Sequence, residues 1–259
     1  MNGFLDGKHA LVTGGGRGIG AAIATALAAE GAVLTLAGRD RAALDAHAAT
    51  LPASAQANVV ICDVADGASV AGAFAAARTR HGEVVVLVNN AGIALSRAFG
   101  KLDPATWDAV LATNLTGTYL CCREAVPAMV DAGYGRIVNI ASTAGLTGGK
   151  YIAAYAASKH GVVGLTRSLA TEIAAKGVTV NAVCPGFTES SMLDRTLATI
   201  AAATHRSEGD AAAALLARNP LERFVRPEEV ASTVVWLCRP ESAAVTGQAI
   251  AIDGGEVQH

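Results

Sequence analysis

The chain has 259 residues, of which 52% are hydrophobic, 16% are charged and 4% are aromatic, and its formal net charge is −2. So much apolar mass excludes a disordered chain, and a count of only 7 prolines excludes a collagen-like one. Without a basic excess, the chain is not expected to bind nucleic acid through charge.

The cysteines and the first residues indicate a cytoplasmic protein. The number of cysteines is odd and none forms a Cys-x-x-Cys pair, so we expect reduced thiols rather than a disulfide framework. Residues 1–8 lack the shape of a signal peptide, and no run of about 18 apolar residues predicts a membrane span. No metal site and no membrane partner are predicted. The cysteines are Cys62, Cys121, Cys122, Cys184 and Cys238.

Short β-branched runs alternate with longer alanine-rich runs along the whole chain. The expected strands, in chain order, are residues 9–13, 32–37, 59–62, 84–89, 136–141, 179–183 and 249–252. The expected helices between them are residues 21–30, 41–50, 68–81, 104–132, 155–175 and 228–237. Repeated strand–helix units predict a single α/β domain whose doubly wound parallel sheet, of about seven strands, carries helices on both faces. Residues 188–219 are expected to form helices outside this sheet.

A glycine-rich loop follows the first expected strand and runs directly into a helix. Residues 13–20 read Thr-Gly-Gly-Gly-Arg-Gly-Ile-Gly. Such a unit points backbone N–H groups and the positive end of the helix at an anion. Gly14 allows the tight turn, Gly18 leaves room for a pyrophosphate, and Gly20 lets the helix approach the sheet. The loop predicts a dinucleotide site, with a flexible turn as the alternative.

The end of the second strand bears on the choice of dinucleotide. An NAD site usually places Asp or Glu there to hold the ribose hydroxyls, but here the strand ends Leu-Ala-Gly and Arg39 follows. A guanidinium suits a 2′-phosphate, and Arg17 in the glycine loop adds a second positive charge. Asp40 is expected to cap the next helix. We therefore favour NADP(H), with NAD(H) as the alternative if Arg39 is only a solvated charge.

A tyrosine and a lysine on one expected helix are candidates for proton transfer. Tyr155 and Lys159 are four residues apart, so they share one helix face. A phenol has a pKa near 10 and needs a nearby cation to stabilise its anion, and such a pair can exchange a proton with a substrate oxygen. Ser142, expected at the carboxyl end of a strand, can stabilise a developing alkoxide. Asn114 is expected to bend its helix or hold a relay water. The alternatives are a chance surface pair and a turn serine.

Two further strand ends carry polar residues toward the same edge of the sheet. Residues 89–92 read Asn-Asn-Ala-Gly after an apolar strand, and Asp63 follows another. We expect the first group to face the dinucleotide and Asp63 to touch its adenine, unless Asp63 only caps a turn or helix.

In this order and at this spacing, the motifs resemble those of the classical short-chain dehydrogenases/reductases over about residues 5–255. The resemblance implies a Rossmann fold and hydride transfer between a nicotinamide and a carbonyl or secondary alcohol. It implies that Tyr155 is the general acid/base and that Lys159 lowers its pKa and holds the nicotinamide ribose. Ser142 would polarise the carbonyl, and Asn114 would anchor a relay water. The implied cofactor-binding residues, with Ser190 where the family has threonine, are Gly14, Gly16, Arg17, Gly18, Ile19, Gly20, Arg39, Asp63, Val64, Asn90, Ala91, Gly92, Tyr155, Lys159, Pro185, Gly186, Thr188 and Ser190.

Within the family the chain looks most like 3-oxoacyl and polyketide-type ketoreductases. Two features depart from that group. Ala94-Leu95-Ser96 stands where many polyketide ketoreductases carry Pro-Gly-Gly, and Thr171 is neutral where fatty-acid ketoreductases carry a basic residue for docking a carrier protein. Residues 129–133 also lack Lys and Arg. A CoA thioester or a free small ketone is therefore favoured over a carrier-bound substrate.

Three functions remain open. The first is an NADP(H)-dependent 3-oxoacyl reductase or hydroxyacyl dehydrogenase, and the second is an alcohol dehydrogenase for a sugar, cyclic alcohol or steroid. The third, a non-catalytic nucleotide sensor or scaffold, is disfavoured because the candidate catalytic residues are intact. Residues 188–220 are expected to form a substrate lid. The resemblance also implies a homotetramer built through helices 104–132 and 155–175 and the C-terminal segment.

Overall fold

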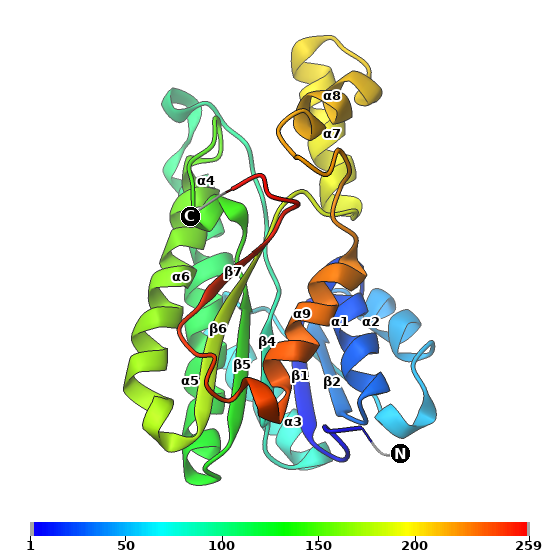
Figure 1. The fold of residues 1–259 in the computed structure, drawn as a ribbon, viewed down its shortest axis with the longest axis vertical. Helices are drawn as coiled ribbons and strands as arrows, with labels where there is room; N and C mark the ends of the chain where they lie inside the picture. Colours follow the sequence, from blue (N-terminus) through cyan, green and yellow to red (C-terminus); the bar gives the residue numbers. More distant parts are fainter. Residues whose placement is uncertain (1–2, 258–259) are drawn as a thin grey trace.

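A single parallel sheet of seven strands organises residues 3–257, the part of the chain that the computed structural model describes (Figure 1). The strand order is β3-β2-β1-β4-β5-β6-β7, with parallel pairing throughout. This confirms the predicted doubly wound sheet. The strands are β1 (His9–Thr13), β2 (Val33–Gly38), β3 (Asn58–Ile61), β4 (Val86–Asn89), β5 (Gly135–Ile140), β6 (Val178–Pro185) and β7 (Ala249–Ile252).

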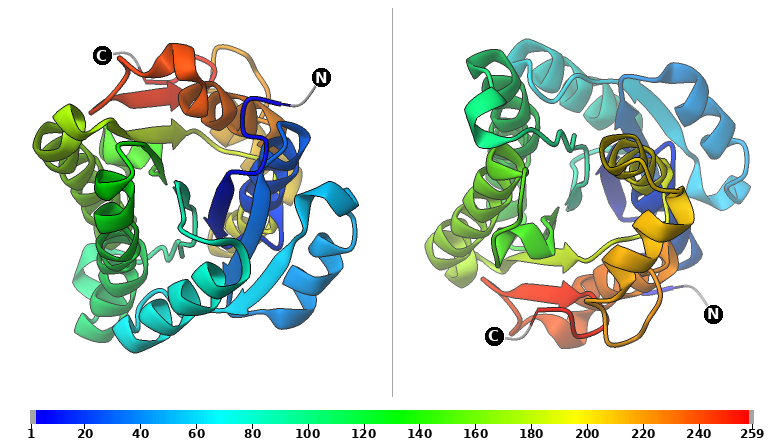
Figure 2. Two further views of the ribbon diagram at one scale, coloured as in Figure 1. Left: turned by 90° about the horizontal axis from the view of Figure 1, so that it is seen from below. Right: turned by 90° about the horizontal axis from the view of Figure 1, so that it is seen from above.

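Helices cover both faces of the sheet (Figure 2). One face carries α1 and α9, which pack against each other, and the other carries α3, α5 and α6. Ala10 and Val12 of β1 belong to the first core, whereas Leu11 between them belongs to the second, because successive strand residues point to opposite faces. The helices are α1 (Gly18–Ala29), α2 (Arg41–Ala48), α3 (Gly67–His81), α5 (Gly117–Asp131), α6 (Ala153–Ile173) and α9 (Pro227–Cys238).

The strand order reverses between β1 and β4, which are neighbours in the sheet. From β1 the chain winds outward through β2 to β3, and from β4 it winds the other way through β5 and β6. In open α/β sheets, ligands bind in the crevice at the carboxyl ends of the strands where the order reverses. The segments that follow β1 and β4 therefore frame the candidate site.

Two helices lie outside the sheet, as expected for residues 188–219. They are α7 (Ser191–Thr204) and α8 (Glu208–Leu216), and they pack against each other. In Figure 1 they project beyond the carboxyl ends of the strands. None of the helices within residues 3–257 is both long and apolar enough to cross a bilayer.

The prediction of a single long helix over residues 104–132 is wrong. The chain forms α4 (Pro104–Leu111), then a π-helical turn (Ala112–Thr116), and only then α5. The hydroxyl of Thr118 donates to the carbonyl of Asn114 at 2.9 Å, and the wider turn accommodates Asn114, a poor helix former. Most other expected boundaries agree to within about three residues, with α1 beginning at Gly18 rather than 21.

Candidate active site

A cleft of about 360 Å³ opens at the carboxyl ends of β1 and β4. It brings together most of the residues that the sequence placed at the cofactor, drawn from segments far apart in the chain. Six of the predicted cofactor-binding residues are not among its lining residues: Gly16, Tyr155, Lys159, Pro185, Gly186 and Thr188. The lining residues are Gly14, Arg17, Gly18, Ile19, Gly20, Gly38, Arg39, Asp40, Cys62, Asp63, Val64, Asn90, Ala91, Gly92, Ile93, Thr113, Ser190, Ser191, Met192 and Arg195.

The glycine loop needs glycine for two different reasons. Gly14 and Gly18 adopt φ values of 67° and 54°, which glycine reaches without steric cost. A Cβ on Gly20 would lie 2.2 Å from the carbonyl oxygen of Gly14, so α1 can start against the loop only without a side chain there. A Cβ on Gly16 would lie 3.0 Å from the backbone of Ala43 in α2. Gly16 therefore serves packing, while the others shape the cleft.

Hydrogen bonds hold the two loops that frame the cleft together. The hydroxyl of Thr13 accepts the backbone N–H groups of Asn90 and Ala91 at 2.9 and 3.0 Å. The side-chain amide of Asn90 donates to the carbonyls of Thr13 and Gly14 at 3.0 and 3.3 Å. Asn90 lines the cleft, and its amide braces the loop after β4 against the glycine loop.

The end of β2 carries one cation suited to a phosphate. Arg39 lines the cleft, 3.9 Å from the carboxylate of Asp63, and both side chains are exposed, so the pair is weak. Asp63 also accepts the N–H two residues on, at 3.0 Å, so it forms a turn as well as facing the cleft. Asp40 caps α2 through Ala43, as expected, and pairs with Arg17. The charge of Arg17 is thereby offset, which leaves Arg39 as the main cation at this end.

Arg195 of α7 is a cleft residue that the sequence did not reveal. It lines the cleft beside Ser190, Ser191 and Met192, and no described carboxylate lies within ion-pair distance of it. A helical sequence pattern does not show which polar residue turns toward a cleft. Its position gives the segment 188–220 a charged group directed at the cofactor side.

The side chains expected to carry the chemistry meet at the start of α6. The Nζ of Lys159 lies 5.7 Å from the centroid of the Tyr155 ring and donates to the carbonyl of Ile140 at 2.8 Å. Ser142, two residues after the end of β5, lies near enough to Tyr155 to influence the pKa of its phenol. A Cβ on Gly92 would lie 3.7 Å from the Nζ of Lys159. The group therefore borders the cleft, although the cleft does not include it.

The environment shifts both titratable groups toward their neutral forms. Burial raises the pKa of Tyr155 above the usual 10, and the neighbouring Ser142 hydroxyl opposes this only in part. Burial lowers the pKa of Lys159 from 10.5 to about 8. In this structure the phenol is thus protonated at neutral pH, and the lysine is still mostly cationic. The expected lowering of the tyrosine pKa by the lysine is not seen here.

Asn114 is tied to the catalytic helix through a serine that the sequence pattern did not single out. Its amide donates to Ser158 Oγ at 3.0 Å and to the carbonyl of Ile93 at 2.9 Å, and its oxygen accepts the N–H of Ile93 at 2.8 Å. Ser158 Oγ in turn donates to the carbonyl of Tyr155 at 2.7 Å. The Asn114 side chain is therefore committed to positioning, and a relay water on this residue stays a prediction. Ser158 lies three residues beyond Tyr155, so helical spacing could have found it.

Comparison with known proteins decides the family. A family model described as enoyl-(acyl carrier protein) reductase matches residues 14–256. A putative ketoacyl reductase of the granaticin polyketide synthase of Streptomyces violaceoruber is 43% identical over 249 residues, covering 95% of this chain and 92% of the relative. The chain is a short-chain dehydrogenase/reductase. It is therefore an oxidoreductase acting on a ketone or alcohol, as the motifs predicted.

Two further likenesses show the range of this dehydrogenase/reductase family. The crystal structure of a single-substitution variant of actinorhodin polyketide ketoreductase with NADPH has a TM-score of 0.94 and 40% identity, and covers 97% of this chain and 98% of that one. D-threitol dehydrogenase of Mycolicibacterium smegmatis is 39% identical, covering 97% of this chain and 93% of the relative. Similar identity thus spans ketone reductases and a sugar-alcohol dehydrogenase.

Residues 186–190, which follow β6, lie partly against the sheet and partly in the cleft of this dehydrogenase/reductase. Ser190 lines the cleft and caps α7, its Oγ accepting the N–H of Leu193 at 3.3 Å. Thr188 is buried and donates to the carbonyl of Gly186 at 3.0 Å. A Cβ on Gly186 would lie 3.0 Å from Asp253. This stretch therefore packs against the end of β7 and positions Ser190 at the cofactor side.

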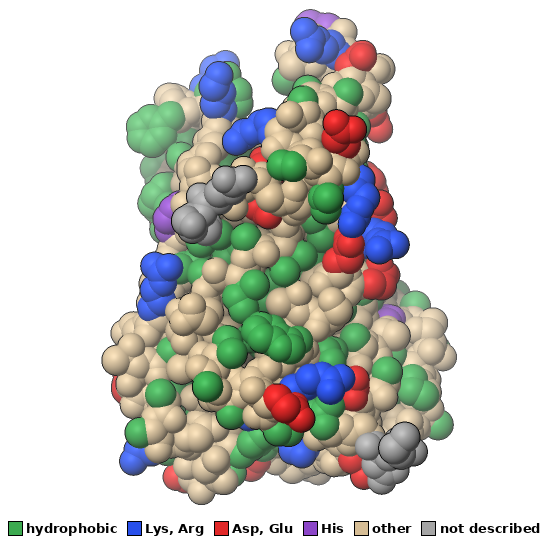
Figure 3. Space-filling view, in the orientation of Figure 1, with side chains coloured by type: hydrophobic (Ala, Val, Ile, Leu, Met, Phe, Trp, Pro, Cys, Tyr) green, Lys and Arg blue, Asp and Glu red, His purple; other side chains and the backbone are tan. Residues whose placement is uncertain are grey.

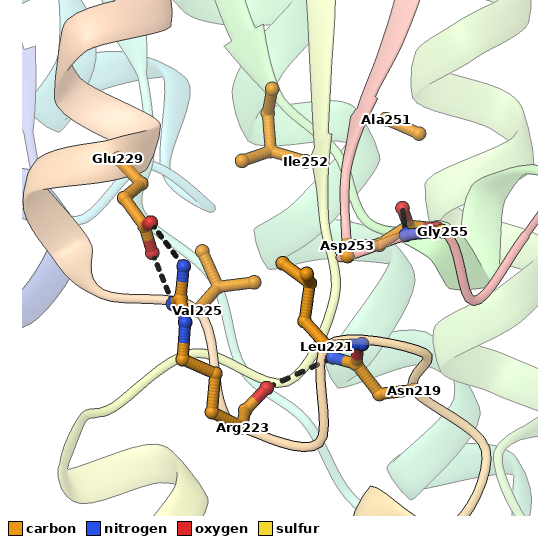
Figure 4. A pocket seen from close by; sticks show the side chains of 10 residues that line it. Asn219, Leu221, Arg223, Val225, Glu229, Ala251, Ile252, Asp253 and Gly255 are labelled. Carbon is orange, nitrogen blue, oxygen red and sulfur yellow. Dashed lines mark hydrogen bonds and ion pairs between the residues drawn. The ribbon is translucent and has the colours of Figure 1, made fainter.

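A second pocket, of about 240 Å³, lies between the start of α9 and the end of β7 (Figure 4). Arg223 donates to both carboxylate oxygens of Glu229, at 2.7 and 2.8 Å, and this pair lowers the pKa of Glu229 to about 2. Asn219 bonds the N–H of Leu221 and the carbonyl of Arg223. Because these polar groups bond one another and the backbone, we interpret this pocket as a place where the end of the lid segment packs against the sheet, rather than as a ligand site.

Proposed function

We propose that this protein is an NADP(H)-dependent ketoreductase that interconverts a 3-oxoacyl thioester of the CoA type and the corresponding 3-hydroxyacyl thioester. The observation that carries this is the grouping of the Ser142 hydroxyl and the Lys159 ammonium around the Tyr155 phenol, at the border of a cleft that Arg39 lines. Similarity to a putative ketoacyl reductase supports the substrate class, and similarity to a ketoreductase structure with NADPH supports the cofactor.

The residues present fit NADP(H). Gly14 and Gly18 place no side chain at the loop that leads into α1, where a pyrophosphate is stabilised by backbone N–H groups. Arg39 offers its guanidinium to a 2′-phosphate. The nearest acid at the end of β2, Asp40, is engaged as a helix cap and with Arg17, so it does not replace the family's ribose-binding carboxylate. When bound, the cofactor supplies or accepts the hydride.

Tyr155 is the group we assign to proton transfer. Because its pKa is raised, the phenol is protonated at neutral pH and can donate its proton to an oxygen that becomes more basic as a carbonyl is reduced. Ser142 accepts the N–H of Ala144 at its Oγ, at 3.1 Å, which leaves the hydroxyl hydrogen to donate toward Tyr155 or the reacting oxygen. Both groups therefore serve the same substrate atom.

Lys159 is the cation that we assign to stabilising the product of that transfer. With a pKa of about 8 it is mostly charged at pH 7, so it favours the tyrosinate that remains after Tyr155 gives up its proton. Its bond to the carbonyl of Ile140 fixes the ammonium group and uses one of three donors. The remaining donors are available to the hydroxyls of a ribose.

The structure and the sequence also bear on the substrate lid, on docking of a carrier protein and on the cellular compartment. Residues 188–220 are proposed as the substrate lid, because Met192 and Arg195 of this segment line the cleft. No carrier protein is proposed as a partner, because Thr171 is neutral and residues 129–133 hold an acid and no base. The five cysteines are free and buried, which supports a reducing compartment such as the cytoplasm.

A homotetramer is proposed, with contact faces on the outer helices and the sheet edge. A Cβ on Gly164 of α6 would meet nothing within 4 Å, so this part of the helix surface is open. Gly161, in contrast, packs on Leu115 of its own chain. Tyr119 of α5 and Trp236 of α9 are 47% and 45% exposed, and exposed aromatic residues are enriched at interfaces. Sedimentation equilibrium at micromolar concentration tests the assembly, and a monomer refutes it.

A substrate panel tests the proposed activity. Acetoacetyl-CoA, cyclic ketones, and sugar alcohols including D-threitol are assayed with both NADP(H) and NAD(H). We expect the highest kcat/KM for acetoacetyl-CoA with NADPH. The second candidate, an alcohol dehydrogenase, is favoured by the likeness to D-threitol dehydrogenase. It replaces the first if an alcohol outperforms the thioester by tenfold or more.

The variant Tyr155→Phe tests the assignment of proton transfer. It removes the hydroxyl but keeps the ring, so we expect turnover to fall by about 10²–10⁴-fold while Kd for NADPH changes less than about threefold. Tyr134→Phe is the matched control for loss of a phenol, because Tyr134 comes just before β5 and so lies at the opposite edge of the sheet. Retained turnover in Tyr155→Phe contradicts the assignment.

A further inference from the structure

Two loops join to form a projection that faces the lid segment, residues 188–220. The N–H of Arg97 donates to the carbonyl of Tyr151 at 2.8 Å, which holds residues 95–102 against residues 147–152. In Figure 1 these segments form the teal and green projection at the upper left, opposite α7 and α8. Figure 3 shows the surface hollowed between the two, with Lys and Arg side chains at the tip of the left projection.

The projection concentrates positive charge in a protein whose formal net charge is −2. Arg97, Lys101 and Lys150 are all exposed. None of them forms an ion pair with a carboxylate of the described residues. The acid nearby is Asp103, whose pKa is lowered first by its cap bonds to Thr106 and only in small part by Arg97. The cations are therefore free to attract an anion.

Two aromatic rings lie among these charges. Phe99 is 80% exposed and Tyr151 is 63% exposed, the highest values for large apolar side chains in the described chain. Tyr151 has a φ of 68°, a left-handed conformation that is unfavourable for a residue with a side chain. Strained residues cluster at ligand sites, and a ring left in water without packing partners has surface to offer a ligand. Arg97, Phe99, Lys101, Lys150 and Tyr151 together are called the basic rim.

The basic rim lies next to the chemistry. Tyr151 precedes α6 by two residues and Tyr155 by four, so the basic rim and the catalytic tyrosine belong to one short stretch of chain. A small cyclic ketone or a sugar alcohol has neither phosphates for the cations nor a planar group for the rings. A CoA thioester has both, at the opposite end from its acyl group.

We propose that the basic rim binds the phosphorylated adenosine end of a CoA thioester substrate. The inference rests on the proposed function and names the residues that would select CoA over smaller ketones. The phosphates pair with Arg97, Lys101 and Lys150 through charge-assisted hydrogen bonds. The adenine stacks on Phe99 or Tyr151, as bases stack on aromatic side chains in nucleic-acid sites.

Kinetics with a full and a truncated thioester test this assignment. The substrates are acetoacetyl-CoA and acetoacetyl-N-acetylcysteamine, which lacks the nucleotide. In the triple variant Arg97→Glu/Lys101→Glu/Lys150→Glu we expect KM for the CoA substrate to rise about 10- to 100-fold, with kcat unchanged. The truncated substrate should be affected less than about twofold. Lys176→Glu, just beyond the far end of α6, is the control for charge reversal and should change neither value.

Ring removal gives a second measurement. Phe99→Ala and Tyr151→Asn should each raise KM for acetoacetyl-CoA several-fold and leave the truncated substrate unaffected. Asparagine is chosen because it tolerates a positive φ, so the backbone is retained. If the loop itself were the cause, both substrates would be impaired together, and that outcome overturns a role in CoA recognition.

A binding measurement separates the two proposals. Free CoA is titrated calorimetrically into protein saturated with NADP⁺, so that the nucleotide cleft is filled. If wild type binds CoA and the triple variant does not, the rim proposal is supported. If wild type binds CoA in this way but turns over no thioester, only the proposed function is refuted. Equal CoA binding by wild type and variant overturns the rim. So does a variant defect confined to an acyl carrier protein substrate, which would assign the surface to a carrier protein.

Discussion

Replacing Arg39 with alanine should weaken binding of NADPH without weakening binding of NADH. A hydrogen bond between charged partners contributes about 1.5–3 kcal/mol. The Arg39 side chain is 65% exposed, so solvent screens it and we take the lower part of this range, about 1.5–2 kcal/mol. This corresponds to about a 10- to 30-fold rise in Kd for NADPH.

The competing partner of Arg39 does not change this result. Asp63 lies 3.9 Å from the guanidinium and is itself 44% exposed, so leaving it for a phosphate costs less than about 1 kcal/mol. In Arg39→Ala the cleft also retains the Asp63 carboxylate, which further disfavours a doubly charged phosphate. NADH, which has no 2′-phosphate, should change by less than about threefold.

The assay is direct titration with NADPH and with NADH, followed by the fluorescence of the reduced nicotinamide, and 2′,5′-ADP is measured by its displacement of bound NADPH. Arg41→Ala is the matched control, because Arg41 is two residues away, pairs with Asp45 within α2 and does not line the cleft. Arg39→Asp should go further and prefer NADH, since it supplies the carboxylate that a ribose needs. The reasoning is refuted if wild type binds NADH more tightly than NADPH, or if Arg39→Ala weakens both cofactors equally.

Three further predictions concern stability and geometry. His9 is buried, and its pKa is lowered from 6.5 to about 4. Because the unfolded chain therefore binds a proton more readily than the folded one, His9 should not reduce stability above pH 6.5 and should reduce it by up to about 3 kcal/mol as the pH drops toward 4. Urea midpoints are measured against pH for wild type and His9→Gln, and the absence of such a loss in wild type would contradict the prediction. Gly20→Ala should lower the free energy of unfolding by about 1–3 kcal/mol and abolish NADPH binding, because the added Cβ would lie 2.2 Å from the carbonyl oxygen of Gly14. Gly72→Ala is the control, because nothing lies within 4 Å of a Cβ there, and in thermal melts it should be neutral or stabilising. Ser158→Ala should lower kcat and destabilise by about 1–3 kcal/mol, because a buried donor of Asn114 loses its acceptor; unchanged kcat would remove Ser158 from the positioning network.

The parts of the site that lie at strand ends could be predicted from sequence. Gly14, Asn90 and Ser142 each follow an apolar run that reads as a buried strand, and a parallel sheet brings the carboxyl ends of its strands to one edge. Once the alternation of strands and helices is recognised, the topology itself gathers these residues. No knowledge of side-chain contacts is needed for that step.

The parts that depend on helix orientation could not be predicted. Gly161 and Gly164 of α6 are the same residue type three positions apart, but a Cβ on Gly161 would meet Leu115, whereas one on Gly164 would meet nothing within 4 Å. Arg195 was one of several polar residues on α7 and gave no sign that it lines the cleft. A helical period fixes which residues share a face, but only the neighbouring elements decide what that face meets.

Asn114 shows how a local irregularity becomes part of the chemistry. Its poor helix propensity predicted a disturbance, and the π-helical turn provides it. The sequence could not show that the side chain then reaches both the backbone of Ile93 and the hydroxyl of Ser158, 21 and 44 residues away. Because Ser158 bonds the carbonyl of Tyr155, the loop that borders the cofactor cleft and the helix that carries the phenol are held by one amide. The orientation of the proton donor relative to the cofactor therefore depends on a residue that needs to touch neither.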